Sequence, residues 1–284
     1  MTQTFRSLWT GLGLVVLTVL LLGQGLVGPA RAADRDKLAA FLSVTGFDVA
    51  LDSLRLSASS APMMLGLDPG VFGAQWTRLA DRVFETDGMR DMALDILSET
   101  LSDELLAHAA GYYASDLGQR LVEAENAGHM MEDDGRKQED GAMLIAAMVE
   151  AGSPRLATIQ RMIRAIDTTG NSARALQEVQ FRFLMAASAA AVIDLKMDAD
   201  ELRSFLKSRE GEVRRSIQKS ALASAAYTYQ SFSDEELLAY TEALEDPQMQ
   251  EVYQLMNAIQ FEIMANRFEV LAAEMAKLQP GQEL

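Results

Sequence analysis

The sequence predicts an all-α protein, and three observations lead to this prediction. Apolar residues recur every three or four positions from Asp34 to Leu278, which is the spacing of one face of a helix. Alanine, leucine, methionine, glutamate and arginine, which all favour helices, dominate the chain, whereas runs of β-branched residues are scarce. No segment shows the alternation of apolar and polar residues that indicates a strand. We therefore expect a multi-helix array or bundle.

The first 32 residues have the organisation of a secretory signal peptide. Arg6 supplies a positive charge, an apolar run from Leu12 to Leu22 follows, and Ala30-Arg31-Ala32 places small residues before a cleavage site. The alternative is an uncleaved membrane anchor, but several glycines and Gln24 weaken this stretch as a membrane span. We expect cleavage after residue 32, a periplasmic location, and no stable membrane association after cleavage.

Cleavage would change the formal net charge from −16 to −18, because Arg6 and Arg31 are lost and no acid is. The remaining 252 residues are enough for one large domain or two small ones. The chain has no cysteine, so packing rather than disulfides must stabilise it. Because nucleic-acid binding depends on Lys and Arg contacts to phosphates, the acidic balance argues against a nucleic-acid partner.

Capping residues followed by proline mark helix starts along the chain. Asp68-Pro69, Ser153-Pro154 and Asp246-Pro247 each place proline at the first helical position after an N-cap. The composition of helix ends or turns recurs at Asp87-Gly88, Gly152 and Gly170-Asn171. We expect roughly ten helices from these signals.

The longest predicted helix begins near Met249. Its apolar positions step by three and four from Val252 to Ile263, and they resume from Phe268 to Leu278 after a slip in register. Such a face needs a partner helix. The simplest partner lies in the same chain, and the alternative is a second copy, so we expect a monomer or a homodimer.

The segment from Leu202 to Lys219 reverses the overall charge of the chain. Its basic residues are Arg203, Lys207, Arg209, Arg214, Arg215 and Lys219. A basic amphipathic helix can lie on anionic lipid, or it can pair with acidic residues of its own fold. Because Gly211 interrupts the helical pattern and glutamates dilute the charge, we expect pairing within the fold.

A short echo in the sequence predicts two related halves. Residues 101–107 read LSDELLA, and residues 232–239 read FSDEELLA. In each copy serine can cap a helix, and Ser233 with Glu236 also fits a capping box. We expect quasi-repeat halves at about 33–135 and 140–284, joined by a charged loop over residues 128–141.

The first copy also resembles a known family. A capped S-D-E-L-L start at Ser102, the pair Tyr112-Tyr113 and a break before Gly118-Gln119 resemble the domain of unknown function 2059 (DUF2059) of exported proteobacterial proteins. The resemblance covers about residues 95–125, and a fainter one near 228–256 lacks the paired tyrosines and the G-Q. It implies a helical fold and export, and it brings no known activity or catalytic residue.

The sequence contains no recognisable nucleophilic site. It has no cysteine, no G-x-S-x-G, and only two histidines, His108 and His129. His108 lies four residues after Glu104 on one helical face, which is the spacing of a ligand pair or an ion pair. The second copy of the echo has Tyr240 at the matching place. We therefore interpret His108 as a packing or capping residue.

His129-Met130-Met131 precedes the acids Glu132, Asp133 and Asp134. Imidazole and thioether ligands favour Cu(I), whereas these acids lack the spacing of a calcium-binding loop. We interpret the segment first as a solvated loop and assign no metal ligand, with periplasmic copper binding as an alternative.

Most of the sixteen methionines fall at the spacing of a helical core, as Met89 and Met256 do. The pair Met63-Met64 lies instead in an apolar connection that would suit a lid over a groove.

Carboxylates offer the remaining route to catalysis. A glutamate in an apolar pocket can act as the acid of a glycan-cleaving enzyme, because the pocket raises its pKa. Glu178 and Glu262 are the best candidates for such an acid, because they have apolar neighbours in the sequence. Each is interpreted first, however, as a residue on the flank of an amphipathic helix.

The sequence therefore predicts an exported helical protein that binds an unknown protein or small ligand. We assign no cofactor and no catalytic residue. The glycan-cleaving enzyme is the alternative, and the distinguishing feature is a buried glutamate with a raised pKa in a cleft.

Overall fold

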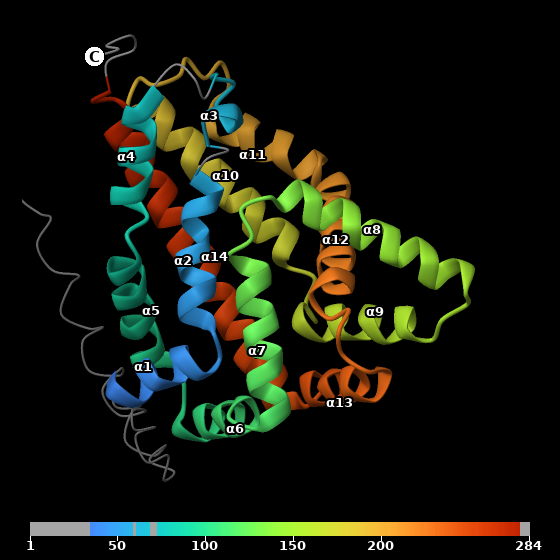
Figure 1. Ribbon diagram of the computed structural model, residues 1–284. Coiled ribbons are helices and arrows are strands. Elements are labelled where there is room, and N and C mark those ends of the chain that lie inside the picture. Colours follow the sequence, from blue (N-terminus) through green and yellow to red (C-terminus); the bar gives the residue numbers. More distant parts are fainter. Residues whose placement is uncertain (1–34, 59–60, 69–72, 279–284) are drawn as a thin grey trace, which may run out of the picture. The chain divides into compact units, whose positions relative to one another are not determined.

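Helices account for all the regular secondary structure in residues 35–58, 61–68 and 73–278, which are the residues that the computed structural model describes (Figure 1). No strand occurs in these ranges, which confirms the all-α prediction. The predicted signal peptide, residues 1–32, lies outside them.

The first seven helices are α1 (Arg35–Val44), α2 (Phe47–Ser57), α3 (Ala61–Met64), α4 (Gly73–Val83), α5 (Thr86–Thr100), α6 (Asp103–Tyr113) and α7 (Asp116–His129). The next seven are α8 (Asp134–Glu150), α9 (Arg155–Ile166), α10 (Ser172–Ala189), α11 (Ala199–Ser208), α12 (Glu210–Thr228), α13 (Asp234–Leu244) and α14 (Pro247–Met275). The described residues thus contain more helices than the roughly ten expected, because short breaks such as that between α11 and α12 divide the pattern.

The long helix α14 organises the core. It packs along α10 and also contacts α4, α5, α6 and α9. Phe268 of α14 meets Phe84 and Phe183 edge to face, with ring centroids 5.5 and 5.0 Å apart. Its partner helix thus lies in the same chain, as the apolar pattern predicts.

The predicted caps position several helices. The carboxylate of Asp246 accepts hydrogen bonds from the backbone N–H groups of Gln248 and Met249, and α14 begins at Pro247 as predicted. α9 begins at Arg155, one residue later than predicted, and Ser153 Oγ accepts a hydrogen bond from the Arg155 N–H. The predicted start at Asp68-Pro69 falls partly outside the described residues.

Both serines of the echo cap a helix. Ser102 Oγ accepts a hydrogen bond from the Leu105 N–H (3.3 Å), and Ser233 Oγ accepts one from the Glu236 N–H (3.2 Å). Glu236 in turn accepts from the Ser233 N–H, which completes the predicted capping box. The echo is therefore matched by local structure, and the division into two related halves stays a prediction.

The predicted charged loop over residues 128–141 is wrong. α7 continues to His129 and α8 begins at Asp134, so only four residues separate the helices. The charged residues stabilise the start of α8 instead: Asp133 accepts from the Arg136 N–H. Gly141 serves close helix packing, because a Cβ there would lie 2.1 Å from the carbonyl oxygen of Ala223 on α12.

The basic segment pairs within the fold, as predicted. Arg203 and Glu178 form an ion pair of 2.9 Å, and Arg214 and Glu210 form one of 2.7 Å. The helical break falls at Arg209, two residues before the glycine that the sequence suggested.

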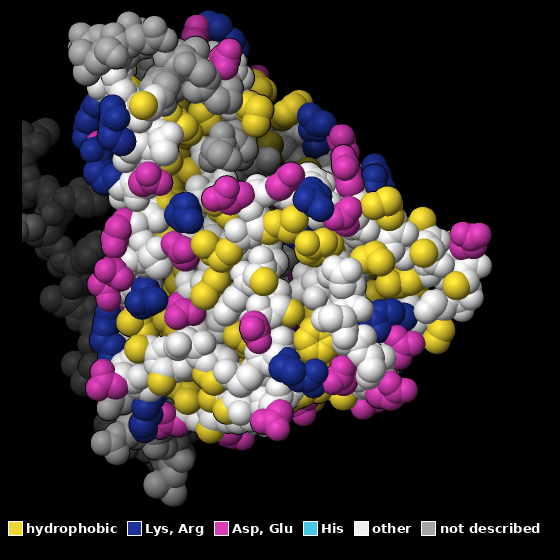
Figure 2. All heavy atoms as spheres, in the orientation of Figure 1, with side chains coloured by type: hydrophobic (Ala, Val, Ile, Leu, Met, Phe, Trp, Pro, Cys, Tyr) yellow, Lys and Arg dark blue, Asp and Glu magenta, His cyan; other side chains and the backbone are white. Residues whose placement is uncertain are grey.

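The surface of the described residues mixes charges of both signs, and hydrophobic side chains gather over α8 (Figure 2). Met143 and Val149 on this helix are 64% and 62% exposed. Near α11, the predicted apolar connection forms α3, and Met64 lines a cavity of about 390 Å³ together with Phe205 and Val213. Among the described residues, no helix has both the length and the hydropathy that crossing a membrane requires.

Candidate functional site

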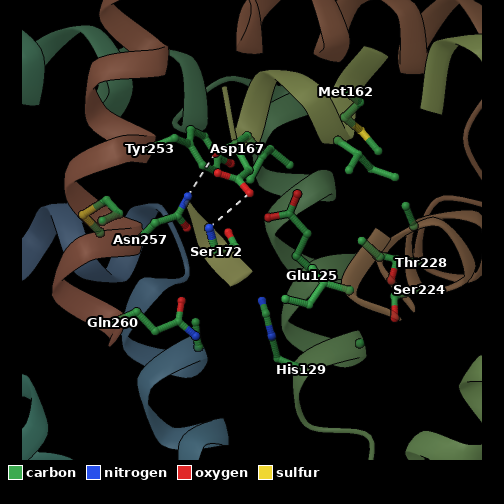
Figure 3. Close-up of a pocket in the computed structure, with 18 of the residues that line it drawn as sticks. Glu125, His129, Met162, Asp167, Ser172, Ser224, Thr228, Tyr253, Asn257 and Gln260 are labelled. Carbon is green, nitrogen blue, oxygen red and sulfur yellow. Dashed lines mark hydrogen bonds between the residues drawn. The ribbon is translucent and has the colours of Figure 1, made fainter. Parts of the chain in front are cut away.

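A pocket of about 580 Å³ opens among α2, α7, α9, α12 and α14 (Figure 3). Its apolar walls include Phe47, Met162, Ile163, Ile217 and Met256. Its polar lining includes Asn126, Ser224, Thr228, Asn257 and Gln260. A concave, largely apolar site of this size with a few polar groups is typical of small-molecule binding.

Glu125 of α7 places a carboxyl group in this pocket. Figure 3 shows its side chain extending from α7 toward the middle of the pocket, with Tyr253 and Asn257 reaching in from α14. The hydroxyl groups of Tyr229 and Tyr240 both donate to Glu125 Oε1, at 2.6 and 2.7 Å. Both of these hydrogen bonds end on the same oxygen, so Oε2 is left for a ligand.

The inner end of the pocket is a cluster of hydrogen-bonded tyrosines. The Tyr240 hydroxyl lies 3.2 Å from that of Tyr113 and 3.1 Å from that of Tyr253, and the hydroxyls of Tyr113 and Tyr253 are also hydrogen-bonded. These three residues come from α6, α13 and α14. With Tyr229 they form what we call the tyrosine cluster.

Close contacts between α6 and α7 hold Tyr113 in the cluster. A Cβ on Gly118 would lie 2.4 Å from the Tyr112 carbonyl oxygen, so only glycine allows α7 to start this close to the end of α6. The Gln119 side chain donates to the Tyr113 carbonyl oxygen at 2.5 Å. Tyr112 packs edge to face on Tyr113 and stacks on Tyr240, with centroids 5.4 and 6.1 Å apart.

Arg155 positions Tyr229 from the opposite side. Its guanidinium donates to the Tyr229 carbonyl oxygen and to Asp234, both at 2.6 Å. It therefore joins the end of α12 to the start of α13, the two helices whose tyrosines donate to Glu125.

Burial shifts the titration of these groups. Burial raises the pKa of Glu125, and the hydrogen bonds from Tyr229 and Tyr240 oppose this shift. Burial also raises the pKa of Tyr112 to about 12, with a further contribution from the charge of Glu125. The pKa of Tyr240 is raised well above its ordinary value for the same two reasons.

Basic groups line the outer part of the pocket. His129 and Lys137 lie on α7 and α8, and Arg164 and Arg214 lie on α9 and α12. Desolvation by the surrounding protein, followed by the positive charge of Lys137, lowers the pKa of His129. The site is therefore richer in cations than the acidic composition of the chain suggests.

Asp167 also lines the pocket, but its carboxylate has a structural role. It accepts hydrogen bonds from the backbone N–H groups of Asn171 (3.1 Å) and Ser172 (3.4 Å) at the start of α10. Both of its oxygens are thereby engaged.

The tyrosine pair, the glycine and the glutamine of the sequence motif thus build one end of this site. Residues 87–150 match the DUF2059 family model. The family is described as an uncharacterized protein conserved in bacteria. The match confirms the predicted resemblance. It covers a longer segment than the sequence motif, from α5 through α8. No curated protein and no solved structure matches the chain.

The DUF2059 segment supplies Tyr113, Glu125, His129 and Lys137 to the site, and the remaining tyrosines come from outside it. Of the histidines considered from sequence, His129 lines the pocket, whereas His108 contacts Asp246, the cap of α14, at 3.1 Å. The interpretation of His108 as a packing or capping residue agrees with this contact.

The acids singled out from sequence lie elsewhere. Glu178 and Glu262 form ion pairs with Arg203 and Arg182 at the surface, at 2.9 and 2.8 Å. Met130 and Met131 do not line the pocket with His129. Among the described residues, no group of three or more His, Cys, Asp or Glu side chains is arranged to hold a metal ion.

Sequence reasoning missed Glu125 and the tyrosine cluster. The available signal was the paired tyrosines of the DUF2059 motif. This motif places tyrosine hydroxyls on α6, but it does not reveal the carboxyl group of Glu125 that lies near them.

Proposed function

We propose that this protein binds a small organic molecule in the pocket around Glu125, outside the cytoplasm. The observation that carries the proposal is a carboxyl group of raised pKa, held by two tyrosine hydroxyls in a largely apolar pocket of about 580 Å³. Such a group fixes the orientation of a ligand while apolar walls supply contact area. The signal peptide predicted over residues 1–32 supports the location.

The arrangement favours binding over catalysis. Glycan hydrolysis needs a second group to act as base or nucleophile beside the acid. Asp167 is the other carboxylate that lines the pocket, and its two oxygens already accept hydrogen bonds from backbone N–H groups.

A pocket-filling variant tests the proposal. Ala221 lines the pocket on α12, and Ser220 beside it is exposed and lies outside the lining. We expect native mass spectrometry against a library of small amphiphilic molecules to find compounds that bind the wild type and Ser220→Trp but not Ala221→Trp. Equal binding by Ala221→Trp would place the compounds elsewhere, and no binding to the wild type would refute the proposed function.

A second candidate function is carboxylate-dependent cleavage of cell-envelope glycans. A buried glutamate of raised pKa is what distinguishes this class of enzyme, and the raised pKa of Glu125 favours this candidate. Incubation with purified bacterial cell wall, followed by measurement of new reducing ends, tests it. Activity that disappears in Glu125→Gln would establish the enzyme, and equal values with and without protein would exclude it.

A further inference from the structure

We propose that the ligand of this pocket is a short apolar peptide with free termini, whose ammonium group meets Glu125 and whose carboxylate faces the basic outer lining. This inference rests on the proposed function and names its ligand class. Four features of the pocket support it: the acceptor at the inner end, the cations outside, the amide side chains and the apolar walls.

The hydrogen bonds at the inner end determine what Glu125 offers to a ligand. Five contacts join Glu125 Oε1 and the four hydroxyls of the tyrosine cluster. Two of these contacts are the hydrogen bonds that Tyr229 and Tyr240 donate to Oε1, so this oxygen is already engaged within the cluster.

These hydrogen bonds leave Oε2 facing the pocket as a hydrogen-bond acceptor, which calls for a donor on the ligand. An ammonium group is the strongest such donor, because its charge favours the ionised carboxylate. This positive charge lowers the pKa that burial raises, so binding of an ammonium group releases protons from Glu125 to the buffer.

The outer lining calls for an anion at the other end of the ligand. Apart from Glu125 at the inner end, the lining holds three cations, Lys137, Arg164 and Arg214, and one further acid, Asp167. Lys137 and Arg214 are paired with Asp134 and Glu210. Arg164 is exposed and interacts electrostatically with Glu245, but it forms no ion pair within 4 Å with a described residue, so it is the cation best able to pair with a ligand.

Titratable groups surround Glu125 on several helices. Those that line the pocket or belong to the tyrosine cluster are Tyr113, Tyr229, Tyr240, Tyr253, His129, Lys137, Arg164, Asp167 and Arg214. With the lowered pKa of His129, its ring adds no cation at neutral pH. The lining therefore combines a carboxyl acceptor at the inner end with fixed cations in the outer part.

The middle of the pocket suits a peptide bond and apolar side chains. Asn257 and Gln260 line the pocket from α14 (Figure 3), and Asn126 lines it from α7. Side-chain amides can both donate to and accept from a peptide group. The Ile, Met and Phe side chains of the walls would contact apolar residues of the peptide.

A matched series of peptides tests the proposal. The probes are leucyl-leucine, its N-acetyl form without the ammonium, and its C-terminal amide without the carboxylate. We expect isothermal titration calorimetry with the exported protein to show leucyl-leucine binding at least about tenfold more tightly than either derivative, since each loses one charged contact. Titrations in buffers of different ionisation enthalpy should show proton release for leucyl-leucine and none for the N-acetyl form.

Two variants assign the ends of the peptide. Glu125→Gln should weaken leucyl-leucine at least about tenfold, abolish proton release and leave the weak binding of the N-acetyl form unchanged. Arg164→Gln should weaken leucyl-leucine but not its amide. Circular dichroism checks that both variants are folded.

Other results would overturn the ligand class. Equal affinity for all three probes, or tighter binding of either derivative, contradicts the assignment of the termini. Binding of a library compound without binding of any probe refutes the peptide and leaves the proposed function standing. Failure of both experiments refutes the two proposals together.

Discussion

The hydroxyl oxygens of Tyr113 and Tyr240 lie 3.2 Å apart, and each belongs to the capped helix of one copy of the sequence echo. The echo places both helices by the same local rule, with a serine at the start. Their tyrosines then meet beside Glu125. The candidate site therefore depends on two segments that are 127 residues apart in the chain.

Gly118 is predicted to be essential for placing Tyr113. Gly118→Ala should destabilise the protein by about 1–3 kcal/mol, because its Cβ would meet the end of α6. Gly111→Ala on α6 is the matched control: nothing lies within 4 Å of the new Cβ, and this change should stabilise the protein by about 0.5–1 kcal/mol. Urea unfolding measures both. Equal effects would contradict the close contact.

The raised pKa of Glu125 predicts how stability depends on pH. The folded protein holds this proton more tightly than the unfolded chain, so the stabilisation is complete below the ordinary pKa of 4.5 and is lost as pH rises through the folded pKa. Glu125→Gln cannot ionise. Its free energy of unfolding, relative to the wild type, should therefore increase with pH across this window.

Urea unfolding at a series of pH values checks this dependence. Glu123→Gln provides the control, since Glu123 is an exposed residue on the same helix. A difference between Glu125→Gln and the wild type that is constant with pH, or that decreases, would show that folding does not raise the pKa of Glu125.

The sequence predicts local features of this fold better than its site. Caps at Ser102, Ser233 and Asp246 depend on residues within one helical turn, so their positions were predictable. The loop expected over residues 128–141 failed because its charged residues cap and pair within α8. Composition alone does not distinguish a solvated loop from a charged first turn.

The site depends on contacts between distant segments. Tyr229 and Tyr240 lie 104 and 115 residues from Glu125, and no sequence pattern joins them. Apolar neighbours in sequence favoured Glu262, but those neighbours describe one helix, whereas Arg182 of another helix holds its carboxylate at the surface. A raised pKa is set by the packing of several helices, which periodicity does not reveal.

Export with cleavage is the third prediction. Small residues at Ala30 and Ala32 predict that the mature protein begins at Ala33. Intact-mass analysis of protein recovered from the periplasm should give the mass of residues 33–284. Protein recovered from the membrane with residues 1–32 attached would indicate an anchored form instead.

The serine caps of α6 and α13 give the last prediction. Ser102→Ala and Ser233→Ala should each destabilise the protein by about 0.5–2 kcal/mol, because each removes the hydroxyl that accepts from a backbone N–H. The loss of stability at Ser233 should lie at the upper end of this range, since Glu236 also accepts a hydrogen bond from the Ser233 N–H. Glycine, which is itself favoured at this position of a helix, should cost only a few tenths of a kcal/mol. The two caps share no hydrogen-bond partner, so the losses should add in the double variant. Urea unfolding of the singles and the double measures this. If only one serine affects stability, the two segments are not equivalent, and their likeness in sequence reflects the common chemistry of helix starts.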